Sequence, residues 1–387
     1  MVTHLADRLQ DIRPFHVMDV LARARKLEAE GRSIIHMEIG EPDFPTPAKI
    51  VQAGIKAIES GNTRYTPALG LPALCERISQ QYPPDYRPDA NQVVITPGAS
   101  GALQLVFGAL INPGNEVLLA DPGYPCNRHF VRLFDGRAVP IPVGPEHGFQ
   151  LNADLIRQHW TGNTVAVLVA SPSNPTGTVV ADREMEAITR TVEELGGVLI
   201  VDEIYHGLTY GNRENSLSSA LRYSSNTFIV NSFSKYFGMT GWRVGWLVAP
   251  VAFIGAVERL AQNIFIAAAT PSQYAALVAF DEDVIDELNR RRDILCRRRD
   301  YLLPALRELG FTIPVTPQGA FYVYADCSRF SSDSYKFALD LLGKTGVAVT
   351  PGLDFGFHKP ESYIRFSYAT DIENLKIAID RLRTFLA

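Results

Sequence analysis

Short apolar runs alternate with segments of helical periodicity between residues 90 and 250. Seven of these runs consist almost entirely of Val, Ile, Leu and Ala, a pattern that indicates strands buried on both faces. In chain order they read QVVIT, EVLLA, RAVPIPV, TVAVLVA, GGVLIVD, TFIVN and RVGWLVA. Helical periodicity intervenes at 101–111 and 183–195. The alternation predicts an α/β fold with a doubly wound, mostly parallel sheet of about seven strands.

The C-terminal part of the chain has a different pattern. Residues 285–309 carry apolar positions at helical spacing, interrupted by two clusters of arginine, and this predicts one long amphipathic helix with a solvated basic face. Strand-like segments follow at 311–327 and 363–370. We therefore expect a large α/β domain over 48–284 and a smaller α+β domain made of 1–47 and 285–387.

Composition and charge narrow the functional classes. The 387 residues are 46% hydrophobic and 20% charged, as in ordinary globular proteins, and the net charge of −5 provides no basic field for nucleic acid or an anionic membrane. The N-terminal segment lacks the apolar core of a signal peptide, and no apolar run reaches the length of a membrane span. We expect a cytoplasmic protein that acts on small molecules.

The cysteines add no structural metal or cross-link to this picture. Their wide spacing has no C-x-x-C pair and no metal-ligand cadence, so we interpret them as reduced packing residues and expect no metal site. They are Cys75, Cys126, Cys296 and Cys327.

One lysine stands out in the segment VNSFSKYFGMTGWRVGW at 230–246. A β-favouring run at 228–230 leads into it, and the glycines after Lys235 leave the backbone free to turn. Most loop lysines extend into solvent. The segment alone therefore leaves two interpretations open, a solvated side chain and one held against an electrophile.

Polar residues follow several of the predicted strands, at the edge where open parallel sheets bind ligands. The segment PGASGALQL follows the first strand and opens a helix whose free N–H groups suit a phosphate, but its spacing is not that of a dinucleotide site. Asn174 lies between two prolines, where turn chemistry alone would explain it. Asp202 ends an apolar strand and needs a partner, for which an arginine and a protonated ring nitrogen are equally suitable.

The segment SFSKYFGMTGWRVG resembles the cofactor-lysine signature of class I and II aminotransferases, the fold-type-I enzymes that bind pyridoxal 5′-phosphate. The resemblance extends over most of the chain. GEPDFPTP, NTRYTPALGLPALCERI, PGYP, SPSNPTG, DEIY and IRFSYA occur in the order of the family. It implies a fold-type-I transferase with a large cofactor-binding domain and a smaller α+β domain.

The resemblance assigns a role around the cofactor ring to five residues. It implies that Lys235 forms the Schiff base with the cofactor aldehyde and, once released, moves the proton of the substrate. Asp202 would keep the pyridine nitrogen protonated, so that the ring can accept electrons. Tyr205 and Asn174 would hydrogen-bond the phenolic oxygen, and Tyr124 would stack on the ring.

The resemblance also assigns the phosphate site. The phosphate would lie on the helix start at Ala99 and Ser100, with Ser232 and Arg243 completing the cradle. Tyr65 would reach the phosphate of a neighbouring subunit. These roles imply a homodimer with shared active sites.

Substrate binding is assigned to Arg365 in IRFSYA, which would hold the α-carboxylate with help from Asn174 and the backbone around Gly40. From the residues alone, a surface ion pair is the simpler interpretation of Arg365. With the resemblance, we expect a ping-pong transfer of an amino group from an L-amino acid to 2-oxoglutarate or pyruvate.

The choice of substrate follows less directly. Members of the family that take aspartate often carry a lysine where this chain has Ser100, so we expect neutral or hydrophobic donors, although an arginine from a partner subunit would reverse this preference. A carbon–sulfur β-lyase and an aspartate aminotransferase remain alternatives, because the cofactor stabilises the same carbanion in each. A non-catalytic regulator is disfavoured, since the chain retains all the chemical residues and has no room for a basic DNA-binding domain.

Overall fold

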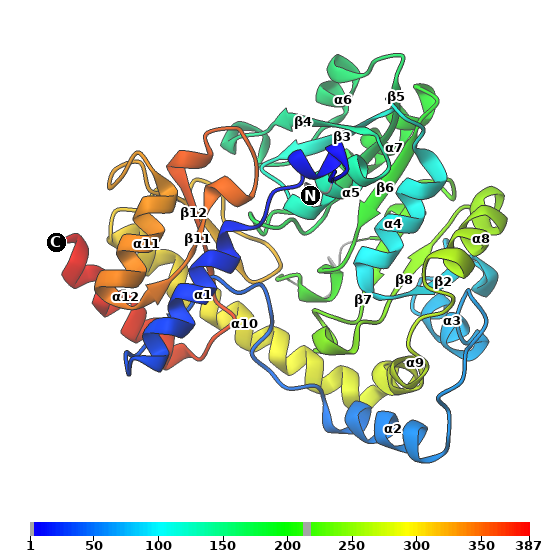
Figure 1. Ribbon diagram of the computed structural model, residues 1–387, viewed down its shortest axis with the longest axis horizontal. Helices are drawn as coiled ribbons and strands as arrows, with labels where there is room; N and C mark the ends of the chain where they lie inside the picture. The colour runs from blue at the N-terminus through cyan, green and yellow to red at the C-terminus, as the bar shows by residue number, and fades with distance from the viewer. Residues whose placement is uncertain (1–3, 212–217) are drawn as a thin grey trace.

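A seven-stranded sheet forms the centre of the larger part of the molecule (Figure 1). The computed structural model describes residues 4–211 and 218–387. The sheet order is β2-β8-β7-β6-β5-β3-β4, and every pairing is parallel except those of β8. The strands are β2 Val93–Thr96, β3 Glu116–Asp121, β4 Arg137–Pro142, β5 Thr164–Ala170, β6 Val198–Asp202, β7 Phe228–Ser232 and β8 Gly245–Val248. The predicted mostly parallel α/β sheet is confirmed.

Helices cover both faces of this sheet because successive residues of its strands point to opposite sides. In β6, Leu199 and Val201 pack into one hydrophobic core cluster, and Ile200 packs into the other. The edge strand β4 is an exception, since most of its residues are partly or fully exposed, and the prediction of burial on both faces was wrong there. The helices are α2 Ala48–Glu59, α3 Pro72–Ser79, α4 Gly98–Leu110, α5 Pro125–Leu133, α6 Ala153–His159, α7 Asp182–Glu194, α8 Ile254–Ile264 and α9 Thr270–Ala276.

Strand β8 runs antiparallel to both of its neighbours. Its first residue, Gly245, pairs with Ser232 at the end of β7 and with Thr96 at the end of β2. The start of β8 therefore lies at the edge of the sheet where the other strands end. This reversal brings Arg243 to the same edge as Asp202, the last residue of β6.

A second sheet and a second core form the smaller part of the molecule (Figure 1). Its sheet is antiparallel with the order β11-β12-β9, and a two-stranded parallel sheet joins β1 to β10. The strands are β1 Ile35–His36, β9 Tyr322–Asp326, β10 Val347–Ala348, β11 Thr350–Pro351 and β12 Tyr363–Ser367. The helices are α1 His16–Ala29, α10 Glu282–Glu308, α11 Ser334–Thr345 and α12 Ile372–Leu386.

Helix α10 confirms the predicted long amphipathic helix, with 27 residues. The segment predicted as a strand from 311 differs, because β9 begins only at Tyr322. Before β9, the segment forms only isolated bridges, from Thr312 to Asp326 and from Gly319 to Thr209. The division of the chain into domains 48–284 and 1–47 with 285–387 stays a prediction, and residues 1–3 and 212–217 lie outside the described part. The four cysteines are free thiols. No helix of the described chain is long and apolar enough to cross a bilayer.

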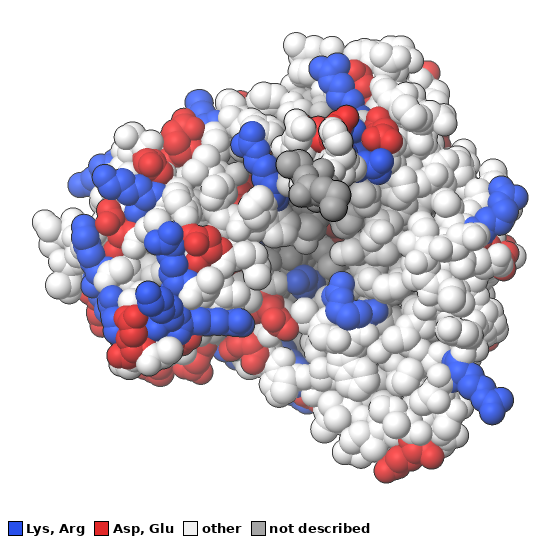
Figure 2. Space-filling view, viewed as in Figure 1, with Lys and Arg blue, Asp and Glu red and all other residues white. Residues whose placement is uncertain are grey.

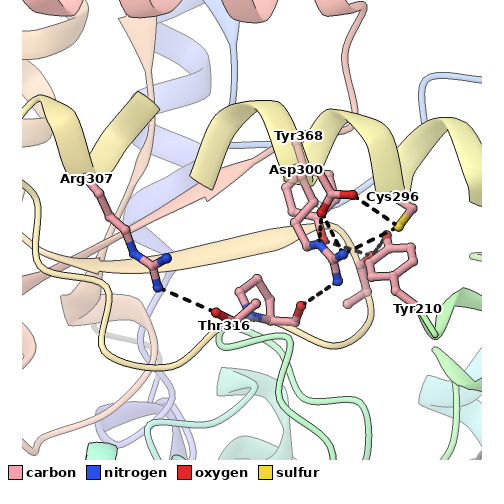
Figure 3. A network of polar contacts seen from close by, with 9 residues as sticks. Tyr210, Cys296, Asp300, Arg307, Thr316 and Tyr368 are labelled. Carbon is pink, nitrogen blue, oxygen red and sulfur yellow. Dashed lines mark hydrogen bonds and ion pairs between the residues drawn. The ribbon is translucent and has the colours of Figure 1, made fainter. Parts of the chain in front are cut away.

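A polar network fixes the loop that precedes β9 (Figure 3). The guanidinium of Arg299 on α10 lies over the ring of Tyr210 and donates a hydrogen bond to the carbonyl of Pro317. The Tyr210 hydroxyl donates to the carbonyl of Ala320. The N–H groups of residues 318 and 319 both donate to the carbonyl of Gly177, in the SPSNPTG turn after β5. The loop therefore joins α10 to the edge of the large sheet and sets where Tyr322 begins β9.

Candidate active site

A cavity of about 300 Å³ lies at the edge of the large sheet where its strands end. In Figure 2 the molecular surface is hollowed between the parts that carry α11 and α8, and basic side chains lie in the hollow. The cavity brings together most of the residues named from the sequence. They are Gly40, Ala99, Ser100, Tyr124, Asn174, Asp202, Tyr205, Lys235, Arg243 and Arg365.

Lys235 lies in this cavity and does not extend into solvent, so the interpretation as a solvated side chain was wrong, while its position against an electrophile stays a prediction. Its Nζ donates a hydrogen bond of 2.7 Å to the carbonyl of Gly40. Burial lowers the pKa of Lys235 to about 8, and the positive charges of Arg365 and Arg243 act in the same direction, against the nearby Glu41. The amine is therefore available as a neutral nucleophile close to neutral pH.

Asp202 is a buried carboxylate on the same cavity wall. Its Oδ1 accepts a hydrogen bond of 3.0 Å from the N–H of Ile204. Burial raises the pKa of Asp202 to about 6, because the ionised form has lost most of its water. A cationic or N–H donor in the cavity would restore the ionised carboxylate, which is what a protonated ring nitrogen provides.

An anion cradle forms where β2 turns into α4. Gly98 has φ +70°, and a Cβ atom there would lie 2.7 Å from Nη2 of Arg243. The guanidinium thus packs directly on the helix start, and Ala99 and Ser100 of the first turn line the cavity beside it. The first N–H groups of a helix have no partner within the helix. Together with Arg243 they favour an anion such as a phosphate.

Arg365 is buried, with 4% of its surface exposed, and it has no carboxylate partner within the described chain. Its Nη1 donates to Oδ1 of Asn174 at 2.8 Å, and its Nη2 donates to the carbonyl of Glu38 at 2.6 Å. The guanidinium lies 4.2 Å from the centre of the Tyr322 ring, and its buried Nε has no hydrogen-bond partner. The surface ion pair considered for Arg365 was therefore wrong. A buried, unpaired guanidinium fits a carboxylate ligand.

Two tyrosines meet at the floor of the cavity. The hydroxyls of Tyr205 and Tyr322 lie 2.9 Å apart, and burial raises the pKa of both. From the sequence, the aromatic run of Phe321, Tyr322 and Tyr324 could line the substrate side of the site, but the alternate burial of a strand explains it equally well. A Cβ atom on Gly40 would lie 2.7 Å from the Tyr322 hydroxyl, so the glycine of GEPDFPTP makes room for it. Other lining residues that the sequence did not single out include Glu38, Thr350, Asp354 and Phe355.

Two expected residues do not line the cavity. Ser232 is buried behind its wall, where its hydroxyl donates to Oγ of Ser234 at 2.9 Å, and Ser234 is the lining residue. Tyr65 is 80% exposed, and its role toward a neighbouring subunit stays a prediction. In this chain Asn174 bonds to Arg365 and Tyr205 bonds to Tyr322, so their contacts with a phenolic oxygen also stay predictions.

The donor set fits pyridoxal 5′-phosphate, the cofactor that the sequence resemblance implies. Lys235 provides an amine for its aldehyde, Asp202 a buried acceptor for its pyridine nitrogen, and Arg243 with the α4 start a cradle for its phosphate. Each requirement is met by a different strand end at one edge of the sheet.

Comparisons with known proteins agree with this chemistry. The family model of class I and II aminotransferases matches residues 32–382. The chain is 39% identical to the (5-formylfuran-3-yl)methyl phosphate transaminase of Methanocaldococcus jannaschii over 99% of each chain, and 38% identical to the valine–pyruvate aminotransferase of Mycobacterium tuberculosis over 96% of each. It superimposes on the aspartate aminotransferase of Thermus thermophilus, solved with maleate, with a TM-score of 0.92 at 33% identity, covering 99% of this chain and 100% of that one.

The lowered pKa of Lys235 predicts selective labelling. At pH 8 about half of the Lys235 side chains are neutral, because the pKa is about 8, whereas a lysine with the pKa of a free side chain is neutral in fewer than about 1% of molecules. A small aldehyde with cyanoborohydride at pH 8 should label Lys235 first, and the rate should rise as the pH passes upward through this value. Peptide mass spectrometry gives the site, with the exposed Lys26 as internal control. Equal rates at the two lysines would contradict the lowered pKa.

The anion cradle predicts that Gly98→Ala disturbs Arg243. The left-handed backbone alone should cost about 1–2 kcal/mol of unfolding free energy, and the new Cβ must displace the guanidinium. Urea unfolding and equilibrium binding of pyridoxal 5′-phosphate would measure the two effects. Gly241→Ala is the matched control, because a Cβ there meets no atom within 4 Å. Similar losses in both variants would argue against the cradle.

Proposed function

Because the chain belongs to the class I and II aminotransferases, which depend on pyridoxal 5′-phosphate, we propose that it transfers the amino group of a neutral or hydrophobic L-amino acid to 2-oxoglutarate or pyruvate in a ping-pong cycle. The observation that carries this proposal is the unpaired guanidinium of Arg365, which lines the same cavity as the amine of Lys235. The first group binds the α-carboxylate of an amino acid, and the second acts at its α-carbon.

Each residue of the site has a different role in the proposed reaction. The bound cofactor supplies an electron sink for the carbanion at the substrate α-carbon. Asp202 would hold the proton on the ring nitrogen of the cofactor, and Arg243 with the α4 start would hold its phosphate. Nζ of Lys235 accepts the proton from the α-carbon and returns it during the reaction. Arg365 fixes the α-carboxylate, and therefore the orientation of the bond that loses the proton.

The N-terminal part of α1 forms an apolar wall of the cavity. The carboxylate of Asp354 accepts hydrogen bonds from the N–H groups of His16 at 2.7 Å and Val17 at 2.8 Å, and so it fixes the first turn of the helix. The apolar residues at the start of α1 that line the cavity are Phe15, Val17, Met18 and Leu21, and Ile39, which follows β1, lines it as well. A wall of this kind excludes water and favours an apolar substrate side chain.

The charges that line the cavity support a donor without a distal carboxylate. The cations of the described lining are Lys235, Arg243 and Arg365. In the proposed reaction, the cofactor occupies Lys235 and Arg243, and the α-carboxylate of the substrate occupies Arg365. The remaining charged residues of the described lining are the carboxylates Glu38, Asp202 and Asp354. A second carboxylate on the substrate would therefore find no free cation supplied by this chain, and it would be repelled by these anions.

The named relatives bear on the donor in different ways. The Mycobacterium tuberculosis relative is a valine–pyruvate aminotransferase, which agrees with an apolar donor and pyruvate as acceptor. The Thermus thermophilus structure is that of an aspartate aminotransferase, so aspartate remains the alternative donor. A carbon–sulfur β-lyase remains the alternative reaction, because it starts from the same carbanion.

We further propose that the active enzyme is a cytoplasmic homodimer. Tyr65 is largely exposed, as a residue that reaches into a neighbouring subunit would be in a single chain. A partner side chain could also add a cation for a distal carboxylate to the lining described above.

An absorption spectrum tests the reaction class. The purified wild type should carry a yellow chromophore whose band moves to shorter wavelength when a mixture of L-amino acids is added, while Lys235→Ala should not make this conversion. Pyruvate and ammonia without a band shift would instead establish the lyase. A protein that acquires no chromophore after addition of the cofactor would contradict the role of Lys235.

A donor panel tests the substrate class. We expect kcat/KM for valine, leucine and alanine to exceed that for aspartate by about tenfold or more, because a distal carboxylate meets no free cation. Each donor would be measured with both 2-oxo acids. Aspartate better than all three by about tenfold would identify an aspartate aminotransferase.

A further inference from the structure

A buried glutamate with only one side-chain partner lines the active-site cavity. Glu38 has no exposed surface, and its Oε1 lies 2.7 Å from Nδ1 of His36. Its Oε2 is buried and has no hydrogen-bond partner. Ionised buried carboxylates persist when they are paired, so His36 is the group on which the charge of Glu38 depends.

His36 bridges two carboxylates from different elements. Its second ring nitrogen, Nε2, lies 3.1 Å from Oε1 of Glu28, near the end of α1. Only the protonated ring can donate hydrogen bonds from both nitrogens. The hydrogen bond with Glu38 raises the pKa of His36 to about 9, with burial acting against it and Glu28 acting with it. The ring is therefore charged at neutral pH.

The other elements packed on β1 bring little charge to this pair. Strand β10 pairs with β1 through Val347 and Ala348, which are apolar. Helix α12 contributes Arg381, whose guanidinium is held by the carbonyl and hydroxyl of Ser33 at 2.8 and 2.9 Å. Glu28 and Glu38 are the two carboxylates within hydrogen-bond distance of the His36 ring.

The backbone of Glu38 and Gly40 holds both reactive cations. The carbonyl of Glu38 accepts hydrogen bonds from Nη2 of Arg365 at 2.6 Å and from the hydroxyl of Thr350 at 3.0 Å. Two residues later, the carbonyl of Gly40 accepts from Nζ of Lys235. A shift of residue 38 would therefore move the guanidinium that binds the substrate carboxylate.

We propose that His36 is a positioning residue for substrate binding, which holds the buried Glu38 carboxylate and, through the Glu38 carbonyl, orients Arg365. Without the charge on His36, the Glu38 carboxylate would be a buried charge with no side-chain partner, which favours its departure from the site. A departing side chain would shift residue 38 and with it the carbonyl that fixes Arg365. The role in catalysis rests on the proposed aminotransferase function, whereas the charge coupling between His36 and Glu38 does not.

Three variants and one control test the proposal. His36→Ala should raise KM for both the amino acid and the 2-oxo acid by about fivefold or more while kcat changes by less than about twofold, because the binding of the carboxylate is weakened and not the chemistry. His36→Gln should recover part of the loss, since an amide can still donate to Glu38. The double variant His36→Ala/Glu38→Gln should recover more than half of it, because no buried charge remains. His147→Ala is the control, since His147 lies beside Glu146 and outside the cavity lining.

Two readouts do not depend on turnover. Imidazole NMR should give His36 a pKa near 9 that falls in Glu38→Gln. Calorimetric binding of isovalerate, a carboxylate that cannot react, should weaken above this pKa in the wild type, as the ring loses its proton and Glu38 loses its partner. In His36→Gln, the affinity for isovalerate should not fall above this pKa. A fall caused by the titration of Lys235 would persist in this variant, so the two causes can be distinguished.

Specific outcomes would overturn the proposal. Unchanged KM and isovalerate affinity in His36→Ala would show that the pair does not orient Arg365. If His36→Ala lowers both the melting temperature and kcat, and the double variant restores neither, His36 has a general structural role. Loss of transamination in the wild type would remove the proposed function, while the NMR and isovalerate measurements would still test the coupling.

Discussion

The active site depends on one strand that runs against its neighbours. Parallel strands deliver their last residues to one edge of the sheet, and β6 delivers Asp202 there. The antiparallel β8 delivers its beginning to the same edge, which places Arg243 against the start of α4. In a parallel orientation, Arg243 would lie at the opposite edge, roughly 13 Å away for four residues of strand. The reversal therefore brings the anion cradle to the wall that carries Lys235 and Asp202.

The cavity holds charges that the chain itself leaves incompletely paired. Among the described residues, all hydrogen-bond partners of the Arg365 guanidinium are neutral, and the Asp202 carboxylate accepts a hydrogen bond from one backbone N–H. Burial of such groups costs free energy, and in an enzyme this cost is part of folding, before any ligand binds. Because the groups are already fixed by Asn174 and Ile204, the binding of a carboxylate or a protonated ring needs little rearrangement. The same lack of water lowers the pKa of Lys235.

The sequence predicted the large sheet well and the smaller part less well, for a physical reason. Seven apolar runs correspond to β2 through β8 within about two residues at each end, because strands buried on both faces have near-continuous apolar sequences. The edge strand β4 shows the limit of that argument, since it has a similar sequence but is mostly exposed, whereas the other edge strand, β2, is buried. The sequence left the role of Tyr322 open and did not single out Glu38. Their positions depend on the loop held by Arg299 and on β1 pairing with β10, which are contacts between segments far apart in the chain.

Three side-chain contacts of the site cross between the two parts of the molecule, and of these pairs the sequence resemblance had grouped only Arg365 with Asn174. Nζ of Lys235 bonds to the carbonyl of Gly40, Arg365 bonds to Asn174, and Tyr322 bonds to Tyr205. In each pair, one residue belongs to the edge of the large sheet and the other to the smaller part. The amine of Lys235 and the guanidinium of Arg365 are thus held by hydrogen bonds that join the two parts of the molecule. In the proposed reaction, a substrate carboxylate that engages Arg365 would also stabilise the arrangement in which Lys235 and Asp202 act, and so binding would be coupled to chemistry through the same few hydrogen bonds.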